Sequence, residues 1–280
     1  MLDRIQRHLG ALIGDRSPLG GPDRLREAES YAQRILQAAG LRVFREPIAA
    51  VGGAWCNVFG DIGPEGAVPL FVVGAHLDTV RGTPGADDNA SGSAALLALA
   101  EWAGGRPAPR SHALRFAAFN LEEWGMVGSQ EHAAALRRAD REVDGMISLE
   151  MIGYVDSAPS AQSFPPGMGI GRRRTGDFVS VVGNGASRKL TARVARSLGS
   201  AGLPVETATL PASLAMLIGA SLSDHASFWR QGYPAVMVGD TAFYRNPHYH
   251  QPTDTLETLS IPFLESVTRG VAAFLEPLGD

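Results

Sequence analysis

Short apolar runs alternate with amphipathic stretches along most of the chain. Runs with the length of buried strands occur at 68–75, 112–120, 143–149, 178–182 and 234–238, and shorter strands are expected at 41–44, 55–60 and 203–207. Helical patterns occupy 22–39, 93–103, 128–139, 187–198 and 262–275, with a short helix ending at Gln231. No linker interrupts this alternation. It predicts one α/β domain over residues 1–280, with a mostly parallel sheet and an early antiparallel hairpin.

Local signals define three of these segments more closely. The helix at 22–39 begins with proline and stops at Gly40, as helices commonly do. Residues 1–21 have an amphipathic pattern interrupted by charges, which predicts an N-terminal helix or arm. Residues 156–177 are rich in proline and glycine and aperiodic, and we expect them to form a wall of the binding site.

Polar side chains follow three of the predicted buried strands. His76 and Asp78 come directly after one strand, Glu122 and Glu123 after the next, and Glu150 after the third. Taken singly, each has an ordinary explanation, because acidic residues that open a helix commonly serve its dipole. The carboxyl ends of parallel strands meet at one edge of a sheet, so these groups should converge. Together they favour metal-assisted hydrolysis.

Composition limits which metals and which partners are expected. A single cysteine, Cys56, excludes an internal disulfide and thiolate clusters, so histidine and carboxylate ligands are expected, with zinc, manganese or cobalt as the metal. The formal charge of −4 argues against a nucleic-acid partner. The chain has neither a signal-peptide core nor an uncharged run of about 18 residues, which predicts a cytoplasmic protein that does not enter a membrane.

Six short motifs carry a resemblance to a known family. They read HLDTV, GADDNASG, NLEEWGMVGS, SLEMIGY, SDHASFW and YHQPTDT, in that order, within roughly residues 22 to 275. This set resembles the M28 metallopeptidases, which include di-zinc aminopeptidases and single-zinc glutaminyl cyclases. The resemblance implies a three-layer α/β/α domain with a mixed, mostly parallel central sheet, as in zinc-dependent exopeptidases.

The resemblance also implies a ligand set for two zinc ions. By motif, His76 and Glu150 would bind one metal, Glu123 and His250 the other, and Asp88 would bridge both. Two such metals would hold a hydroxide between them and polarise the scissile carbonyl. The resemblance further implies a cis peptide bond between Asp88 and Asn89.

Three more residues receive catalytic or supporting roles. Adjacent side chains in an extended chain point in opposite directions, so Glu122 and Glu123 are not expected to bind the same metal. The family pattern makes Glu122 the general base. Asp78 would orient the His76 imidazole. The Tyr249 hydroxyl would donate to the developing oxyanion, or the Tyr249 ring would serve packing alone.

One position departs from the family pattern. Relatives mostly carry aspartate where this chain has Glu150, whose carboxylate is one methylene longer. Either the backbone retreats to accommodate the longer side chain, or the metal site on the His76 side is altered or weakened. The function of a single-zinc glutaminyl cyclase therefore remains an alternative.

The leading prediction is an aminopeptidase that releases N-terminal residues from peptides. A glutaminyl cyclase-like aminoacyltransferase and an amidase or deacylase acting on a small conjugate are the alternatives. The expected partner is a peptide or an aminoacyl small-molecule substrate. A binding protein that has lost hydrolysis is least expected, because it would show gaps in the ligand set. Side-chain specificity and oligomeric state are not predicted.

Overall fold

An eight-stranded sheet organises the protein. The computed structural model describes residues 1–280 except 51–52, 67, 166–168, 170 and 280. The strands are β1 (Arg42–Ala50), β2 (Gly53–Ile62), β3 (Leu70–His76), β4 (Ala113–Phe119), β5 (Val143–Glu150), β6 (Val179–Asn184), β7 (Val205–Leu210) and β8 (Ala235–Gly239). Their order across the sheet is β1-β2-β4-β3-β5-β8-β6-β7.

Four central strands run in the same direction. β4, β3, β5 and β8 are parallel neighbours, β2 lies antiparallel to β4, and β6 lies antiparallel to β8. The expected mixed, mostly parallel sheet is thus confirmed. The early hairpin joins β1 to β2 in antiparallel register. Residues 63–66, whose glycines and proline predict a turn, follow β2 on the way to β3. β4 nevertheless lies between these two strands, antiparallel to β2 and parallel to β3.

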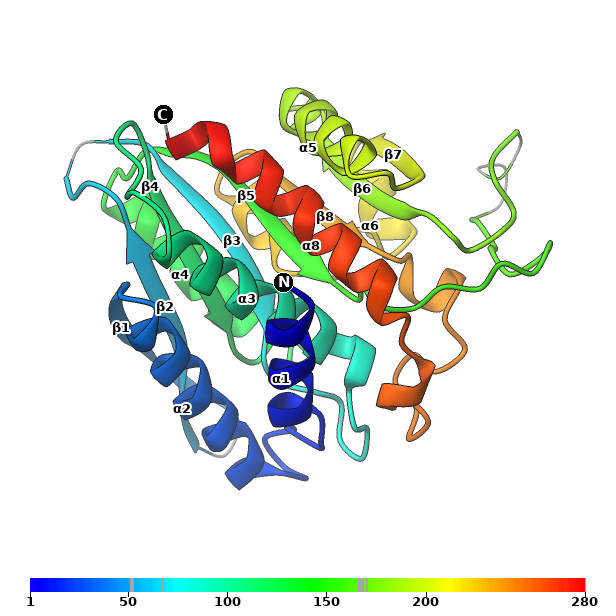
Figure 1. Cartoon of the computed structure of the whole chain (residues 1–280), viewed down its shortest axis with the longest axis horizontal. Coiled ribbons are helices and arrows are strands. Elements are labelled where there is room, and N and C mark those ends of the chain that lie inside the picture. Colours follow the sequence, from blue (N-terminus) through cyan, green and yellow to red (C-terminus); the bar gives the residue numbers. More distant parts are fainter. Residues whose placement is uncertain (51–52, 67, 166–168, 170, 280) are drawn as a thin grey trace.

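Helices cover both faces of the sheet, which confirms the three-layer architecture. They are α1 (Leu2–Leu12), α2 (Pro22–Ala38), α3 (Gly92–Gly104), α4 (Val127–Arg138), α5 (Arg188–Ser200), α6 (Ala212–Leu217), α7 (His225–Arg230) and α8 (Ile261–Leu275). Figure 1 shows α1, α2, α3, α5 and α8 across the near face. Side chains of α4, α6 and α7 pack in separate apolar clusters against the opposite face.

The α3 helix lies at the centre of the larger core. Every residue from Gly92 to Ala100 is buried, and most are alanine, leucine or serine. Small side chains let the helix approach the sheet closely while α1, α2 and α8 pack against its other sides. No helix in the described part of the chain is long and apolar enough to cross a membrane.

Two expectations about elements need correction. Strands β1 and β2 extend well beyond the expected 41–44 and 55–60, because each continues pairing with the other to the end of the hairpin. Pro47 lies within β1, which is tolerated because β1 is an edge strand. Helix α6 was not expected from the sequence. It has six residues, too few to display a helical period.

Candidate metal centre

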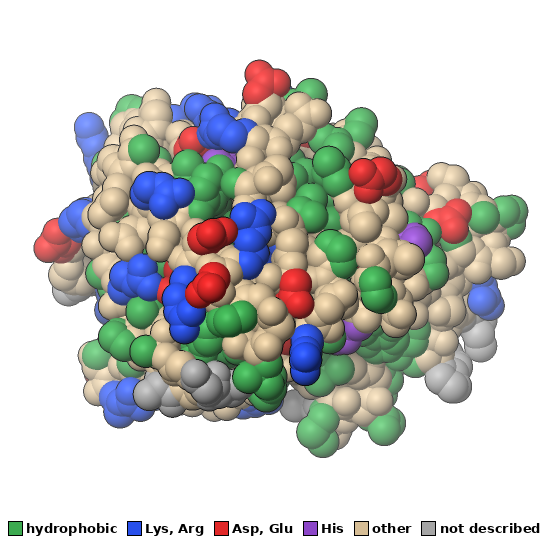
Figure 2. Space-filling view, turned by 90° about the horizontal axis from the view of Figure 1, so that it is seen from below, with side chains coloured by type: hydrophobic (Ala, Val, Ile, Leu, Met, Phe, Trp, Pro, Cys, Tyr) green, Lys and Arg blue, Asp and Glu red, His purple; other side chains and the backbone are tan. Residues whose placement is uncertain are grey.

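The ends of three neighbouring strands deliver most of the candidate site. His76 is the last residue of β3, Glu150 is the last residue of β5, and Glu122 and Glu123 follow β4. The arrowheads of β3 and β5 point toward the lower side of the molecule in Figure 1. That side faces the viewer in Figure 2, where acidic, basic and hydrophobic side chains are interspersed. The predicted convergence of polar groups on one edge therefore occurs.

The structure brings the five candidate ligands into two clusters that share Asp88. On one side, His76 Nε2 lies 3.4 Å from Asp88 Oδ1 and 3.4 Å from Glu150 Oε1. On the other side, His250 Nε2 lies 3.1 Å from Asp88 Oδ2 and 3.3 Å from Glu123 Oε2. The two oxygens of the Asp88 carboxylate thus face different histidines, as a bridging carboxylate requires.

The spacing of these atoms fits zinc. A tetrahedral zinc ion with bonds of about 2.1 Å separates neighbouring ligand atoms by about 3.4 Å. The four distances above lie close to that value. Glu123 Oε1 is also buried without a hydrogen-bond partner among the described residues. A buried carboxylate oxygen without a partner is costly, so a cation at this position would satisfy it.

Electrostatics at the two histidines reflect the crowding of carboxylates. Burial lowers the pKa of His76, but Glu150, Glu122 and the contacts with Asp78 and Asp88 together raise it well above the usual value. Burial likewise lowers the pKa of His250, but hydrogen bonds to Asp88 and Glu123 raise it to about 10. Burial raises the pKa of Glu123 to about 7, with Asp88 adding to the effect. The site therefore attracts positive charge, whether carried by protons or by metal ions.

Backbone contacts fix the position of Asp88. It lies in the segment Ala86–Ser91 at a kink where the backbone of Asp88 and Asn89 is not helical, and its peptide bond to Asn89 is cis, as expected. The Asp254 carboxylate accepts the backbone N–H groups of Asp87 at 2.8 Å and Asp88 at 3.0 Å. The Asn89 side chain donates to the carbonyl oxygen of Leu149, one residue before Glu150. Asp254 was not singled out from the sequence, although it lies within the quoted motif YHQPTDT, and the contact between Asn89 and Leu149 was not predicted either.

Asp78 contacts both halves of the site. His76 Nδ1 lies 3.1 Å from the Asp78 carbonyl oxygen and 3.6 Å from its carboxylate Oδ1. The two carboxylate oxygens accept the backbone N–H groups of Glu122 at 3.0 Å and Glu123 at 3.1 Å. The expected contact with the imidazole is thus made more closely by the carbonyl group, while the carboxylate anchors the turn that carries both glutamates.

Glu122 and Glu123 play different parts in the geometry. Glu123 belongs to the cluster with Asp88 and His250, whereas Glu122 belongs to neither cluster. Burial raises the pKa of Glu122 well above its usual value; His76 opposes this shift, and Glu150 and Glu123 add to it. Divalent cations beside Glu122 would favour its carboxylate form. Glu122 is therefore a buried carboxyl group beside the clusters that is available for proton transfer.

Tyr249 stacks on His250 with ring centroids 3.7 Å apart and an interplanar angle of 21°. Burial raises the pKa of its hydroxyl above the usual value, so this group stays protonated and can donate a hydrogen bond. The Tyr249 side chain also lines the cavity described next.

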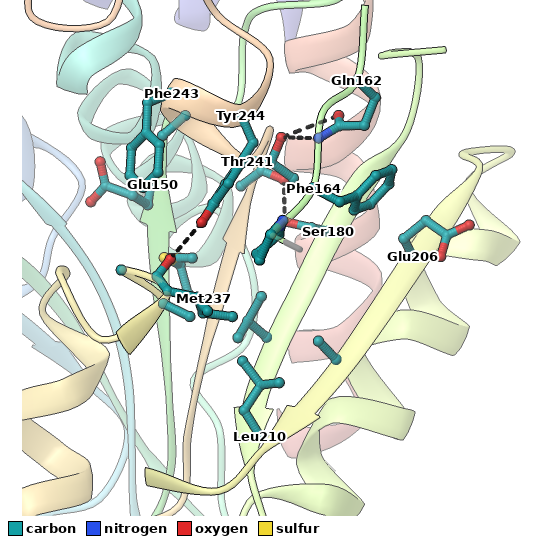
Figure 3. Close-up of a pocket in the computed structure, with 18 of the residues that line it drawn as sticks. Glu150, Gln162, Phe164, Ser180, Glu206, Leu210, Met237, Thr241, Phe243 and Tyr244 are labelled. Carbon is teal, nitrogen blue, oxygen red and sulfur yellow. Dashed lines mark hydrogen bonds between the residues drawn. The ribbon is translucent and has the colours of Figure 1, made fainter. Parts of the chain in front are cut away.

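A cavity of about 150 Å³ opens beside Glu150 and Tyr249. Figure 3 shows it extending from Glu150 past Met237 and Ser180 toward Glu206. Its walls are largely apolar and come from β6, β7, β8 and the segments after α6 and β8. Four residues of the expected wall segment 156–177 also line it: Gln162, Phe164, Pro165 and Arg172.

Comparisons with known proteins identify a family and similar chains. The model of Peptidase family M28 matches residues 57–275. The uncharacterized protein YfbL of Escherichia coli is 36% identical, with 98% of this chain and 86% of that protein covered. Leucine aminopeptidase 1 of Arthroderma otae is 27% identical over 77% of this chain, and the match spans 56% of the fungal enzyme.

Solved structures share the fold. The LapA aminopeptidase of Legionella pneumophila has a TM-score of 0.80 and 21% identity, covering 100% of this chain and 72% of LapA. BSAP, a zinc aminopeptidase of Bacillus subtilis, has a TM-score of 0.62 and 23% identity, covering 82% of this chain and 52% of BSAP. The glutaminyl cyclase of Porphyromonas gingivalis has a TM-score of 0.71 and 18% identity, covering 99% of this chain and 96% of the cyclase.

Proposed function

Because the chain belongs to peptidase family M28, we propose that it is an aminopeptidase that uses two zinc ions to release N-terminal residues from peptides. The observation that carries this proposal is the shared carboxylate of Asp88, whose two oxygens lie 3.4 Å from His76 and 3.1 Å from His250. The fungal leucine aminopeptidase and the zinc aminopeptidase among the similar proteins support both the reaction and the metal.

His76, Asp88 and Glu150 would hold one ion, and Asp88, Glu123 and His250 the other. Cobalt and manganese accept the same nitrogen and oxygen ligands. Bound zinc would supply a water of lowered pKa and would polarise the scissile carbonyl.

The chain's own residues would carry the proton and position the substrate. Glu122 takes a proton from the attacking water and returns it to the leaving amine, which is the work of a general base that then acts as an acid. Asp78 holds the backbone of Glu122 and thereby its position. The Tyr249 hydroxyl donates to the oxygen of the tetrahedral intermediate.

The cavity supports a preference for substrates with an apolar first residue. It adjoins Glu150 and Tyr249, and its walls include Phe164, Phe178 and Met237. A cavity of about 150 Å³ holds a benzene-sized group when its walls are apolar. Leucine or phenylalanine side chains at the N-terminus of a peptide fit this environment.

A second candidate is a cyclase acting on N-terminal glutamine. It is favoured by the similarity to the Porphyromonas gingivalis enzyme, which is covered over 96% of its length. Glu150 also differs from the aspartate expected in a di-zinc site. An amidase acting on small aminoacyl conjugates is a third possibility for the same carboxylate-rich centre.

One set of assays separates these functions. The purified protein is stripped with a chelator, reloaded with zinc, and tested on leucine p-nitroanilide, its N-acetylated form and a peptide beginning with glutamine. An aminopeptidase regains activity with zinc and strongly prefers the free amine, because blocking the amine leaves acidic groups of the site without a partner. Equal turnover of the acetylated substrate favours the amidase, and ammonia release from the glutamine peptide favours the cyclase. Activity that survives complete metal removal would contradict all three.

A further inference from the structure

The N-terminal segment contacts the loop that connects two proposed metal ligands, although this segment lies outside the family match, which begins at residue 57. Arg16 follows α1 and is 1% exposed. It lies against the loop from Leu77 to Gly85, which connects the ligand His76 to the turn that carries Asp88. A fully buried arginine is rare. This one contacts Leu77, which follows the proposed ligand His76, and Gly85, which precedes the turn with the proposed ligand Asp88.

The Arg16 guanidinium binds carbonyl oxygens at both ends of this loop. Nε donates to Leu77 at 2.7 Å, and Nη2 donates to Gly85 at 3.1 Å. Nη1 donates to Pro84 at 3.3 Å and to the carbonyl oxygens of Leu12 and Gly14 in its own arm. One planar side chain therefore ties the beginning and the end of the loop to the N-terminal arm.

Backbone contacts reinforce the same junction. The Arg16 N–H donates to the Thr79 hydroxyl at 3.0 Å, and the Gly82 N–H donates to Asp15 at 2.9 Å. A Cβ atom at Gly85 would lie 3.1 Å from Arg16 Nη2 and 2.4 Å from the Asp88 carbonyl oxygen. The loop thus approaches the arginine as closely as glycine allows.

Arg16 lacks the partner that buried arginines usually have. Among the described residues, no carboxylate oxygen lies within 4.0 Å of its guanidinium, whereas a buried charge is ordinarily paired. Burial lowers its pKa to about 10, opposed by Asp78, Asp88 and Asp254. The guanidinium therefore stays charged at neutral pH, and the carboxylates that compensate it belong to the metal centre and its support.

We propose that Arg16 is a positioning residue of the metal centre, which holds the Leu77–Gly85 loop so that His76 and Asp88 are set before a metal ion binds. The inference rests on the proposed function, because it takes these two residues as ligands. A loop that is already ordered loses little conformational entropy when the ligands close on an ion. Without the guanidinium, the loop must be ordered by the metal itself, and the affinity falls.

Two other roles for Arg16 give different results. If its positive charge dominated, replacing it with a neutral residue would strengthen metal binding, because a repulsion would be removed. If it served the fold alone, its loss would lower stability but leave the affinity of the folded protein for zinc unchanged. Arg16→Lys keeps the charge without the planar fork, and Arg16→Met removes both.

The experiment measures zinc affinity by competition with a chromophoric chelator, together with thermal unfolding of the metal-free protein. Leu9→Ala is the matched control, because Leu9 is fully buried in the same arm and belongs to the core packed around α3. We expect Arg16→Lys and Arg16→Met to bind zinc about 10-fold to 100-fold more weakly, the range seen for residues that orient metal ligands. Leu9→Ala should unfold at a lower temperature and keep the wild-type affinity.

Thr79→Val provides a second variant in case the arginine variants do not fold. It removes the hydroxyl that accepts the Arg16 N–H and preserves side-chain shape. It should also weaken zinc binding, by several-fold. Wild-type affinity in the folded variants, or tighter binding by Arg16→Met, would overturn the proposal while the proposed function stands. Failure of the wild-type protein to bind zinc would overturn both.

Discussion

The Ser223 hydroxyl donates a hydrogen bond of 2.7 Å to Glu150 Oε2. The same hydroxyl lies 3.1 Å from the Ser148 hydroxyl. Glu150 therefore has one oxygen engaged with Ser223, while its other oxygen, Oε1, lies 3.4 Å from His76 Nε2. This contact explains how a carboxylate one methylene longer than aspartate is held in place at the end of β5.

Removing this hydroxyl should weaken metal binding on the His76 side. In Ser223→Ala, the Glu150 carboxylate loses the bond that orients it, so we expect about 10-fold weaker binding of one ion, with the other ion retained. Metal stoichiometry after dialysis against a series of buffered zinc concentrations measures this. Thr268→Val is a suitable control, because the Thr268 hydroxyl bonds to Leu264 within α8. Equal stoichiometry in Ser223→Ala and the wild type would contradict the role of Ser223.

The two ions should leave in a fixed order. Glu150 offers one free oxygen, whereas Glu123 has Oε2 at 3.3 Å from His250 and a second buried oxygen without a partner among the described residues. The Glu123 side can thus supply more ligand atoms. We expect the first ion to leave from the His76 side on dialysis. Anomalous diffraction maps of partly depleted crystals locate the remaining ion. If the ion on the His250 side left first, the predicted order would be wrong.

Neutralising each of the adjacent glutamates should have different effects. Glu122→Gln removes a proton acceptor that belongs to neither cluster, so kcat should fall about 100-fold to 10,000-fold while zinc content stays at the wild-type level. Glu123→Gln removes a ligand and should lose metal. Kinetics and metal analysis on the same preparations test both. Metal loss in Glu122→Gln would mean that the two roles are exchanged.

The sequence predicted the fold and the convergence of His76, Glu122, Glu123 and Glu150 from local patterns. Asp88 and His250 entered the predicted ligand set through the family resemblance. Buried parallel strands appear in a sequence as continuous apolar runs. Residues directly after such runs lie at the carboxyl edge of the sheet, so they can be identified as candidate ligands.

The roles of Asp254 and Ser223 were not predicted. Each acts on a residue about 70 or more positions away, at Asp88 and Glu150 respectively, and no local period reports such a contact. Arg16 was missed for the same reason, because its side chain contacts Leu77 and Gly85, which lie 61 and 69 positions away.

The buried His8 should make stability depend on pH. It is fully buried in α1, with Nδ1 2.8 Å from the Tyr31 hydroxyl. Burial lowers its pKa from 6.5 to about 4, although Glu101 opposes the shift. Between these values the unfolded chain binds the proton and the folded protein does not, so stability is full above pH 6.5 and falls as the pH drops toward 4.

This dependence can be isolated with one substitution. Between pH 7 and pH 5, His8 should cost the metal-free protein about 2 kcal/mol of unfolding free energy. In His8→Gln the contribution of His8 to this loss of unfolding free energy disappears, while all other titrating groups remain. Urea unfolding of both proteins at the two pH values measures the difference. If both proteins lost the same unfolding free energy between pH 7 and pH 5, unfolding would not add a proton to His8, and the prediction would be wrong.

The shape of the cavity should determine which first residue is accepted. Val182 lies in β6, is 9% exposed and lines the cavity, while its neighbour Val181 packs in the core on the opposite face of the sheet. Side chains alternate between the faces of a strand, so a larger residue at 182 must enter the cavity. Val182→Phe should therefore fill space that the side chain of an N-terminal phenylalanine would occupy.

We expect Val182→Phe to change the selectivity for the first residue and not to lower activity on all substrates. A group lost from an apolar pocket is worth about 1–3 kcal/mol, so kcat/KM for a phenylalanine anilide should fall about 10-fold to 200-fold in Val182→Phe. An alanine anilide leaves the cavity largely empty and should be hydrolysed at close to the wild-type rate. Thr209→Phe is the control, because Thr209 is exposed on β7 and does not line the cavity. Equal losses on both substrates would mean that the cavity does not receive the first side chain.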